Sequence, residues 1–335
     1  MTANLTLVTG GAGFLGRHVV DCLLAGGCPV RVLDRQPDDR QSGAEWVLGS
    51  VTDEQTVASA CNGVARIIHL AAIPHLWSSD MQDFARVNHT GTQMMLDAAK
   101  AQEVSAFVHV SSLTTRIAGA SGGMPRTVTE ADLPGVEDML GAYPRSKWLA
   151  EAAARQAYDD GLPVRIAIPT MPLGPGDIGL TPPSQMVLDF VSGRTPAYLE
   201  TWMNIADARD MASSLVAMLD IDVPRYGLFV GGENLQLSDL LQRLEAVSGV
   251  AMPRSKVPGF VAQAFAYADE FVVTRLTGKP PKAPLTGVKL ARRPIQFDMQ
   301  AARKVLPSPR HSLDDTLSDL LNWFEAEGLW SGRKG

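Results

Sequence analysis

Short apolar runs alternate with amphipathic stretches along the first half of the chain. The runs are mostly aliphatic and β-branched, as expected for strands that are covered on both faces. They are residues 5–9, 30–34, 45–48, 66–70, 106–111 and 164–168. Between them, residues 14–25 and 84–101 have apolar positions at helical intervals. This alternation predicts parallel strands joined by crossover helices, as in a doubly wound sheet.

The pattern changes after Pro169. Connectors rich in proline and glycine separate one short strand at 228–230 from isolated helices, which we expect over residues 207–219, 237–248 and 313–327. We assign these elements to a smaller capping lobe. The stretch 113–141 is rich in glycine and has no sustained period, which predicts a long loop. The fold class is therefore α/β, with a doubly wound parallel sheet and a smaller mixed α/β C-terminal lobe.

A glycine-rich turn joins the first predicted strand to the first predicted helix. Glycines stand at positions 10, 13 and 16 of the segment TGGAGFLG. Gly10 allows a turn where a Cβ would clash, Gly13 lets a pyrophosphate approach the backbone, and Gly16 lets the helix pack close to the strand. The spacing differs by one residue from G-x-G-x-x-G, so a glycine turn without a ligand is the alternative. The setting predicts a Rossmann-type dinucleotide-binding domain over residues 1–170, to which some later segments return, and a mainly substrate-binding lobe over residues 171–335.

Asp34 stands at the end of the second predicted strand. A carboxylate there can accept hydrogen bonds from both hydroxyls of an adenosine ribose, and it would repel a 2′-phosphate. Arg35 can instead hold such a phosphate or stack on the adenine. These residues favour NAD as the cofactor and leave NADP open. For Asp34 the alternative is a turn aspartate without a ligand.

Tyr143 and Lys147 lie one helical turn apart at the start of a predicted amphipathic helix, so their side chains share one face. A phenol has a pKa of about 10, and its use as a base at neutral pH requires a nearby cation that stabilises the phenolate. Lys147 can be that cation and can also hold the nicotinamide ribose. Ser112, with Ser111 or Thr114 as alternatives, follows the fifth predicted strand, where its hydroxyl can hold the substrate oxygen. The alternatives without a catalytic role are a solvent-exposed helix face for Tyr143 and Lys147, and a cap on local backbone groups for Ser112.

Charge and cysteine content narrow the choice of partners. The chain has 30 Lys and Arg, 36 Asp and Glu and a net charge of −6, without a basic stripe, which argues against nucleic acid. Its three cysteines lack metal-type spacing, so no metal is implied and a reducing compartment is expected. The sequence has no cationic leader and no uninterrupted apolar run of membrane-spanning length. We expect a cytoplasmic protein that binds small molecules and has no membrane span.

Together these features resemble the extended short-chain dehydrogenase/reductase family, of the NAD-dependent epimerase/dehydratase type. The family's T-G-x-x-G-x-x-G matches Thr9 to Gly16, and its H-x-A-A matches His69 to Ala72. Its helix asparagine matches Asn88, and its Y-x-x-x-K matches Tyr143 to Lys147. The resemblance covers nearly the whole chain, and the joint match is more specific than any single motif.

The resemblance also implies roles for individual residues. Asn88 would brace the active site, and residues 169–172 would pass near the nicotinamide. Many relatives carry Gly-Asp after the third strand, where this chain has Gly49 and Ser50, so adenine recognition would depend on Ser50 or on backbone. The residues that we expect to contact the cofactor are Gly10, Gly13, Phe14, Leu15, Gly16, Asp34, Arg35, Ser50, Val51, Leu70, Ala71, Ala72, Tyr143, Lys147, Pro169 and Met171.

A narrower likeness extends into the second lobe. The segments 75–77, 174–178, 195–198, 231–235 and 278–282 are similar to stretches of the hopanoid-associated sugar epimerases, a branch close to dihydroflavonol reductases. This likeness implies little about the substrate. Aromatic and other side chains in connectors over the strand ends would form the wall of a substrate pocket. The candidates are His75, Trp77, Thr114, Tyr198, Trp202 and Met203.

Further expectations concern packing. Asp207 and Asp210 would serve structure in the second lobe. Residues 260–276 are rich in Phe, Val and Ala and are expected to form a core helix of that lobe, with a surface for a membrane, a lipid-like substrate or a partner helix as the alternative. A homodimer is common in this family, and the apolar faces that would allow it lie around Met94, Met95 and Trp148.

The sequence thus predicts an NAD(P)-dependent oxidoreductase of the extended short-chain type. Tyr143 would exchange the hydroxyl proton, Lys147 would stabilise the phenolate, and Ser112 would hold the alcohol or carbonyl oxygen. An NAD-dependent sugar epimerase or dehydratase is the first alternative, because a transient ketone can take hydride back on its other face. A dinucleotide-binding sensor without turnover is the alternative of another class, and the retention of Tyr143 and Lys147 argues against it. Net redox chemistry is preferred because the second lobe shows no evident cluster of basic side chains for a diphosphate.

Overall fold

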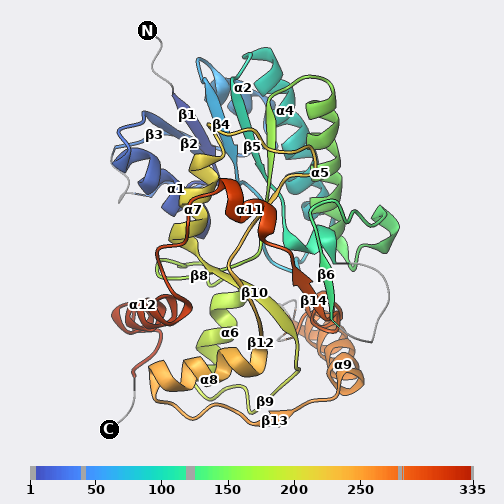
Figure 1. Cartoon of the computed structure of the whole chain (residues 1–335). Coiled ribbons are helices and arrows are strands. Elements are labelled where there is room, and N and C mark those ends of the chain that lie inside the picture. The colour runs from blue at the N-terminus through green and yellow to red at the C-terminus, as the bar shows by residue number, and fades with distance from the viewer. Residues whose placement is uncertain (1–4, 39–42, 118–124, 278–280, 282, 333–335) are drawn as a thin grey trace.

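The structure is a computed structural model of the chain and describes residues 5–38, 43–117, 125–277, 281 and 283–332. A seven-stranded sheet forms the centre of its larger part (Figure 1). All neighbouring strands in this sheet run parallel. In spatial order the strands are β11 (Leu228–Val230), β7 (Val164–Pro169), β5 (Ala106–Val110), β4 (Arg66–His69), β1 (Thr6–Thr9), β2 (Val30–Asp34) and β3 (Glu45–Leu48). Every run predicted as a strand in the first half lies in this sheet, which confirms the doubly wound α/β fold.

The strands are apolar because helices cover both faces of the sheet. Successive side chains of a strand point to opposite faces. Accordingly, Leu7 packs in one core with α2, α4 and α5, whereas Val8 packs in a second core with α1 and α7. Figure 1 shows the two groups of helices on either side of the strands. The helices are α1 (Phe14–Ala25), α2 (Glu54–Cys61), α4 (Gly91–Ala101), α5 (Ala142–Asp159) and α7 (Ala208–Ala217).

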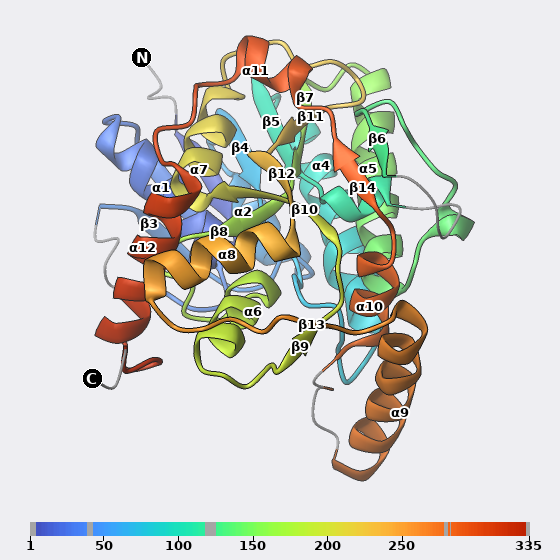
Figure 2. The same ribbon diagram turned by 60° about the horizontal axis from the view of Figure 1, so that its bottom comes forward.

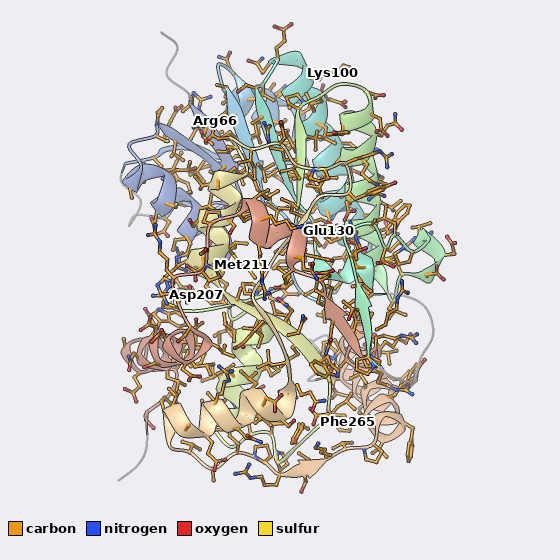
Figure 3. The ribbon with its side chains drawn as sticks, viewed as in Figure 1. Arg66, Lys100, Glu130, Asp207, Met211 and Phe265 are labelled. Atoms are coloured by element: carbon orange, nitrogen blue, oxygen red, sulfur yellow. The ribbon has the colours of Figure 1, made fainter. Side chains whose placement is uncertain are left out.

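Two elements that the sequence pattern assigns to the smaller lobe, β11 and α7, belong to the larger part of the molecule instead. β11 is an edge strand beside β7, and its Phe229 is fully buried in the same core as Ile166 and Ile168. α7 packs along α1, with Met211 (labelled in Figure 3) and Leu215 in the core on that face. The partners of both elements lie far away in the sequence, so periodicity alone does not show which sheet they join.

The stretch 113–141 is not the plain loop that its composition predicts. Strand β6 pairs in parallel with β14 (Ile295–Phe297), which comes from near the C-terminus. Glu130, which follows β6, accepts a hydrogen bond from the backbone N–H of Phe229 on the edge strand β11 (3.2 Å; Glu130 is labelled in Figure 3). This segment is therefore fixed to both parts of the molecule. Its elements are the 3₁₀ turns η2 (Leu113–Arg116) and η3 (Val136–Asp138) and the strand β6 (Arg126–Val128).

The smaller lobe is built on a three-stranded sheet. Strand β10 lies between β12, to which it is antiparallel, and β8, to which it is parallel. Helices α6, α8 and α12 share one apolar core with this sheet (Figure 2). The elements are β8 (Met171–Leu173), α6 (Pro182–Val191), β9 (Ala197–Tyr198), β10 (Trp202–Asp207), β12 (Glu233–Gln236), α8 (Leu237–Ser248), β13 (Ser255–Lys256), α10 (Leu285–Ala291) and α12 (Leu313–Ala326). Helix α11 (Gln300–Val305) packs instead against β11 of the large sheet.

Asp207 joins elements of both parts (Figure 3). It caps α7 by accepting a hydrogen bond from the backbone N–H of Arg209 (2.8 Å), and it pairs with the Arg209 guanidinium (2.6 Å). The hydroxyl of Thr316 on α12 donates to the same carboxylate (2.9 Å). Asp210 accepts hydrogen bonds from the backbone N–H and the ring of His311 (3.0 and 3.1 Å). Both aspartates hold packed elements together, as the sequence predicts.

Helix α9 (Gly259–Thr277) is not a core helix of the smaller lobe, which corrects the expectation for residues 260–276. Ala266 is fully buried, but Phe260 and Phe265 are 72% and 57% exposed. Helix α10 packs against α9, which stands at one edge of the molecule (Figure 2). No helix in the described ranges is both long and apolar enough to cross a bilayer.

Candidate active site

A cavity of about 1200 Å³ opens beside the carboxyl ends of the large sheet's strands, where open α/β sheets bind their ligands. It exceeds the ~300–1000 Å³ that is common for small-ligand pockets, which leaves room for a dinucleotide and a second molecule. One wall comes from the turns after the parallel strands. The opposite wall comes from β8, α6, β10, α10 and β14 of the smaller lobe and its neighbours.

The glycine bend after β1 forms a cradle that larger side chains would fill. Gly10 has φ +74°, and a Cβ on it would lie 2.8 Å from the backbone nitrogen of Ala71. A Cβ on Gly16 would lie 2.0 Å from the carbonyl oxygen of Gly10, so helix α1 can approach the strand only without one. Gly13 precedes α1 and offers no side-chain cap to its first N–H groups. These N–H groups suit the pyrophosphate of a dinucleotide.

Asp34 lies at the carboxyl end of β2, half-buried on the cavity wall beside this bend. Its carboxylate accepts hydrogen bonds from the backbone N–H of Ala12 (3.0 Å) and of Arg35 (2.6 Å). Each oxygen retains capacity for a further donor, so a ribose hydroxyl can still bind there. Arg35 also lines the cavity, and its side chain is exposed. The bend and this carboxylate therefore fit a dinucleotide.

The adenine end of the cavity lacks a carboxylate from the turn after β3. Ser50 and Val51 line the cavity, and the Ser50 hydroxyl bonds to that of Thr52 (2.8 Å). Asp53 instead caps α2 by accepting from the backbone N–H of Thr56 (2.9 Å). The turn after β3 thus offers a hydroxyl, and no carboxylate, to the cavity.

Tyr143, Lys147 and Ser112 meet at the carboxyl end of β5. Tyr143 stands in the first turn of α5, and its hydroxyl lies near that of Ser112. The Ser112 hydroxyl also accepts hydrogen bonds from the backbone and hydroxyl of Thr114 (3.3 and 3.0 Å). The Lys147 ammonium donates to the carbonyl oxygen of Val110 (2.7 Å). All of these residues line the cavity.

Burial shifts the ionisation of both catalytic candidates. It raises the pKa of the Tyr143 phenol, and the neighbouring Ser112 hydroxyl opposes that rise. It lowers the pKa of the Lys147 ammonium to about 8, and the negative charge of Glu151 opposes that fall. Without a ligand, the phenol is therefore neutral at neutral pH and holds a proton that it can give away.

A buried ionic cluster lies behind this pair, and sequence reasoning missed it. Glu151, one turn after Lys147, is fully buried and accepts hydrogen bonds from Ser111 (2.6 Å) and Thr115 (2.9 Å). Its carboxylate pairs with two guanidiniums, those of Arg116 (2.8 Å) and Arg155. The Tyr-Lys-Glu spacing at four-residue intervals was a signal for one shared face. No feature of the nearby sequence predicted that Arg116 and Arg155 pair with Glu151.

Asn88 is not part of the cavity wall; its side chain holds the start of α5 in place. It lies in a π-helical turn, η1 (Ala85–Thr90), which with α3 (Gln82–Phe84) and α4 replaces the single predicted helix. Its side chain accepts from the backbone N–H of Ile73 (2.8 Å) and donates to the hydroxyl of Ser146 (2.9 Å). Ser146 donates to the carbonyl oxygen of Tyr143 (2.8 Å). A π-helical turn inside a helix often marks a functional position.

The cavity wall contains most of the residues that the sequence singles out. Every residue expected at the cofactor lines it, and so do His75, Thr114, Trp202 and Met203. Trp77 and Tyr198 are not in its wall; Tyr198 is buried beside Lys256, whose ammonium lies 6.0 Å from its ring. Wall residues that sequence reasoning missed include Met186 of α6, Leu290 of α10, Arg293 between α10 and β14, and Phe297 of β14.

The fold and the cavity are those of a dinucleotide-dependent oxidoreductase or epimerase. The model of the NAD-dependent epimerase/dehydratase family matches residues 6–226, and the chain belongs to that family. This confirms the resemblance found in the motifs. The family is NAD-dependent, so the chain is an NAD-dependent enzyme of the reductase, dehydrogenase and epimerase class.

Relatives of known sequence or structure extend the match to the whole chain. "Putative dihydroflavonol 4-reductase" of Synechocystis sp. is 32% identical, over 97% of this chain and 96% of that protein. "Sterol demethylase protein B" of Methylococcus capsulatus is 28% identical, over 97% of this chain and 99% of that protein. The crystal structure of gox2253 has a TM-score of 0.82 and 30% identity, and it covers 97% of this chain and 99% of that one.

Proposed function

We propose that this enzyme interconverts a secondary alcohol and a carbonyl compound, with Tyr143 as the group that exchanges the hydroxyl proton. One observation carries the proposal: Tyr143, Lys147 and Ser112 line the same cavity whose wall holds the glycine bend and Asp34. Bound NAD would supply the hydride acceptor, or NADH the donor, at the nicotinamide ring. The bend at residues 10–16 and Asp34 would hold it.

Residues of this chain would donate and accept the proton of the substrate hydroxyl. In reduction, Tyr143 gives its proton to the carbonyl oxygen, and Ser112 donates a hydrogen bond to the same oxygen. Lys147 uses one N–H on Val110, which leaves two donors for a ribose and a positive charge that stabilises the phenolate. In oxidation the proton moves the other way. Asn88 acts through Ser146 as a positioning residue for the first turn of α5.

Net redox chemistry is preferred over epimerisation because of the second wall. Among the residues after position 170 that line the cavity, Arg293 is the one Lys or Arg side chain within the described ranges. A nucleoside diphosphate carries several negative oxygens and is usually held by more than one cation. The wall is otherwise rich in apolar side chains, such as Met186, Leu290 and Phe297. The names of the two curated relatives mention a dihydroflavonol and a sterol, and neither of these is a nucleoside diphosphate.

Tyr143→Phe tests the proposal, with Tyr158→Phe as the matched control on the same helix. Tyr158 is 38% exposed and does not line the cavity. Purified protein would be incubated with NAD⁺, NADP⁺, NADH or NADPH and a panel of alcohols, ketones and aldehydes, while nicotinamide absorbance is followed. We expect turnover in the wild type and in the control, and its loss in Tyr143→Phe with cofactor binding retained.

Other outcomes of the same experiment identify the alternatives. A changed sugar without net change in absorbance would indicate an epimerase. Cofactor binding with no turnover of any substrate would favour the dinucleotide sensor. Activity retained by Tyr143→Phe would refute the role of the phenol.

The proposal also includes the cofactor preference, the location and the assembly. Asp34 beside the bend favours NAD over NADP, although Arg35 keeps NADP open. The free thiols Cys22, Cys28 and Cys61 suit the cytoplasm. A homodimer would form through α4 and α5, which lie side by side and carry half-buried Met94 and Trp148; Met95 is inside the chain's own core. Light scattering would measure the mass in solution.

A further inference from the structure

Arg293 brings an uncompensated charge into the cavity. It follows α10 and precedes β14, and it lines the wall of the smaller lobe. Its Nε and Nη1 are shielded from solvent and have no hydrogen-bond partner within the described ranges. The guanidinium of its neighbour Arg292 instead packs against Gly259, outside the cavity wall.

The Arg293 side chain is half-buried, and its two shielded nitrogens without an acceptor are costly. Arginine stays charged at all ordinary pH values, so it cannot escape the cost by losing its proton. Buried donors in folded proteins nearly always have a partner, and a buried charge is usually paired. An acceptor that arrives with a ligand removes the cost. The arrangement therefore favours binding of an anion at this point of the cavity.

The other charge that the smaller lobe brings to the cavity belongs to a different place. Asp177 is fully buried, and its carboxylate accepts from the hydroxyl and backbone of Thr181 (2.6 and 2.8 Å). It follows Gly176, whose carbonyl oxygen accepts from Arg17 of α1 (2.9 Å). Asp177 thus stands near the dinucleotide end, and no ion pair joins it to Arg293.

The wall to which Arg293 belongs is largely apolar. Its large apolar side chains include Met171, Met186, Trp202, Met203, Leu290 and Phe297, and its uncharged polar side chains are Thr181, Thr201 and Asn204. Methionine and aromatic side chains of this kind fit hydrocarbon skeletons. One guanidinium presents Nε and a terminal nitrogen as parallel donors, which match the two oxygens of a carboxylate.

We propose that the substrate is an apolar alcohol or ketone that carries a carboxylate, and that Arg293 binds this carboxylate. The inference rests on the proposed function, because Tyr143 and Ser112 receive the reacting oxygen. In the reduction, hydride from NADH goes to the carbonyl carbon and the proton of Tyr143 goes to the carbonyl oxygen. The carboxylate is unchanged. Arg293 is thus a specificity residue for the proposed reaction.

The test compares Arg293→Leu with the wild type and uses Arg292→Leu as the matched control. The probes are a medium-chain 3-oxo acid and its neutral methyl ester, each with NADH. We expect the KM of the acid to rise ten- to hundredfold in Arg293→Leu, with little change for the ester, because a charge-assisted pair is lost. Arg293→Lys should recover part of the preference for the acid. Equal effects on acid and ester would overturn the proposal.

Binding gives a readout that does not depend on turnover. The acid should stabilise the NAD-loaded wild type and NAD-loaded Tyr143→Phe against heat, and it should not stabilise NAD-loaded Arg293→Leu. Acid binding without turnover would retain the Arg293 site and refute the proposed function alone. Absence of any preference for acid over ester in the wild type would refute the site. Tighter binding of an alkyl phosphate of the same chain length would identify phosphate, not carboxylate, as the anion and overturn the assignment.

Helix α9 carries an independent observation, an apolar stripe on the surface. Its exposed positions recur at spacings that place them on one side of a helix. Among residues 260–273, whose side chains the structure describes, none of the exposed positions is charged. They are Phe260, Val261, Ala264, Phe265, Tyr267, Ala268, Phe271 and Val272.

The acidic side chains of α9 are bonded inside the protein, whereas a basic side chain lies at the edge of the stripe. The two acidic residues of α9 are used internally, since Asp269 accepts from the backbone N–H of Ala283 (3.0 Å) and Glu270 from that of Leu285 (2.8 Å). At the edge of the stripe, the Lys289 ammonium lies 6.0 Å from the ring of Tyr267. An apolar stripe with aromatic and cationic residues at its edge is complementary to an anionic lipid surface.

We infer that α9 docks on the surface of an anionic bilayer without crossing it. Helix α10 packs against α9 and contributes Gly287, Leu290 and Ala291 to the cavity wall. The docking surface is thus one helix away from the cavity. An apolar carboxylate held by Arg293 would be concentrated at such an interface, but the docking stands on its own test.

Flotation with vesicles tests the docking. Wild-type protein should float with vesicles that contain phosphatidylglycerol, and less with phosphatidylcholine alone. The double variant Phe260→Glu/Phe265→Glu should lose flotation, whereas Val305→Glu, at an exposed valine on α11, should retain it. No flotation of the wild type would refute the inference. Loss of a dimer in the double variant, seen by light scattering, would assign the stripe to a second copy of the chain instead.

Discussion

Lys147 is buried, and the cost of keeping its ammonium charged there reduces the stability of the fold. Its side chain is nearly fully buried, and burial lowers its pKa from 10.5 to about 8. At 1.36 kcal/mol for each pKa unit, the fall corresponds to about 3 kcal/mol. The folded protein therefore bears about 3 kcal/mol at pH 7 to keep this ammonium charged, with Val110 and Glu151 as compensation.

The sign of the pH dependence follows from this depressed pKa. Below pH 8 the ammonium is charged in both the folded and unfolded chain, and the full cost is present. Between about pH 8 and 10.5 the unfolded chain still binds a proton that the folded chain has lost, so stability rises with pH. The contribution of Lys147 to unfolding free energy should become less unfavourable by about 1 kcal/mol between pH 7 and 9.

Lys147→Met removes the charge and keeps an apolar side chain of similar length. The variant loses the cost of burying the charge and leaves the Val110 carbonyl without its donor, which costs about 1–3 kcal/mol. We expect it to be at least as stable as the wild type at pH 7, and inactive. Its stability relative to the wild type should then fall by about 1 kcal/mol at pH 9, because the penalty of about 3 kcal/mol in the wild type has decreased by that amount.

Urea unfolding at pH 7 and pH 9 measures this difference. Comparison of the two proteins at each pH cancels the titration of every group that they share. Lys100→Met is the control, because Lys100 is exposed on α4 (Figure 3) and its replacement should leave no pH-dependent difference. A stability difference for Lys147→Met that is the same at both pH values would refute a depressed pKa at Lys147.

Three other residues give predictions at different points of the site. Asp34→Ala should weaken NAD binding about ten- to hundredfold and NADP binding much less, because two hydrogen bonds to a charged acceptor are lost; fluorescence titration that shows equal weakening would contradict the ribose assignment. Gly16→Ala should destabilise the fold by about 1–3 kcal/mol in urea, because its Cβ would lie 2.0 Å from a carbonyl oxygen, whereas Gly26→Ala, with nothing nearer than 3.4 Å, should not. Glu151→Gln should cost about 3–5 kcal/mol in the same assay, because Arg116 and Arg155 lose a buried partner, and exposed Glu327→Gln is the control; a loss below about 1 kcal/mol would contradict the importance of the buried pairs.

The parts of the structure that sequence reasoning predicts are those that depend on nearby residues. The parallel strands were recognisable because burial on both faces makes each one a short apolar run. The glycine bend was recognisable because backbone approach requires glycine at fixed spacing, as Gly10 and Gly16 show. The cofactor wall follows from these two features together, since every strand end of the sheet meets at one edge.

The parts that were missed depend on pairs of distant residues. β6 and β14 are separated by most of the second lobe, and neither is long enough to give a periodic signal. Arg116 lies in a turn and Glu151 lies in a helix, and nothing in the sequence of either segment predicts that they form an ion pair. The two serines after β5 are intermediate. Adjacent residues of an extended chain face opposite sides, so one of Ser111 and Ser112 had to face inward. Only the fold shows that Ser111 donates a hydrogen bond to Glu151 and that Ser112 lies near the Tyr143 hydroxyl.

The charges around the cavity differ in how the protein compensates them, and that difference indicates where a ligand supplies charge. On the dinucleotide side, Arg17 pairs with Asp38 (2.6 Å), and Asp34 accepts two backbone hydrogen bonds. Lys147 is oriented by Val110 and faces the field of Glu151. Those groups are held in place before a ligand arrives, as preorganised catalysis requires. Arg293 has no such partner within the described ranges, so its binding energy becomes available only when an anion enters. The fixed side of the cavity suits the cofactor that the whole family shares, and Arg293 is where this chain would select its own substrate.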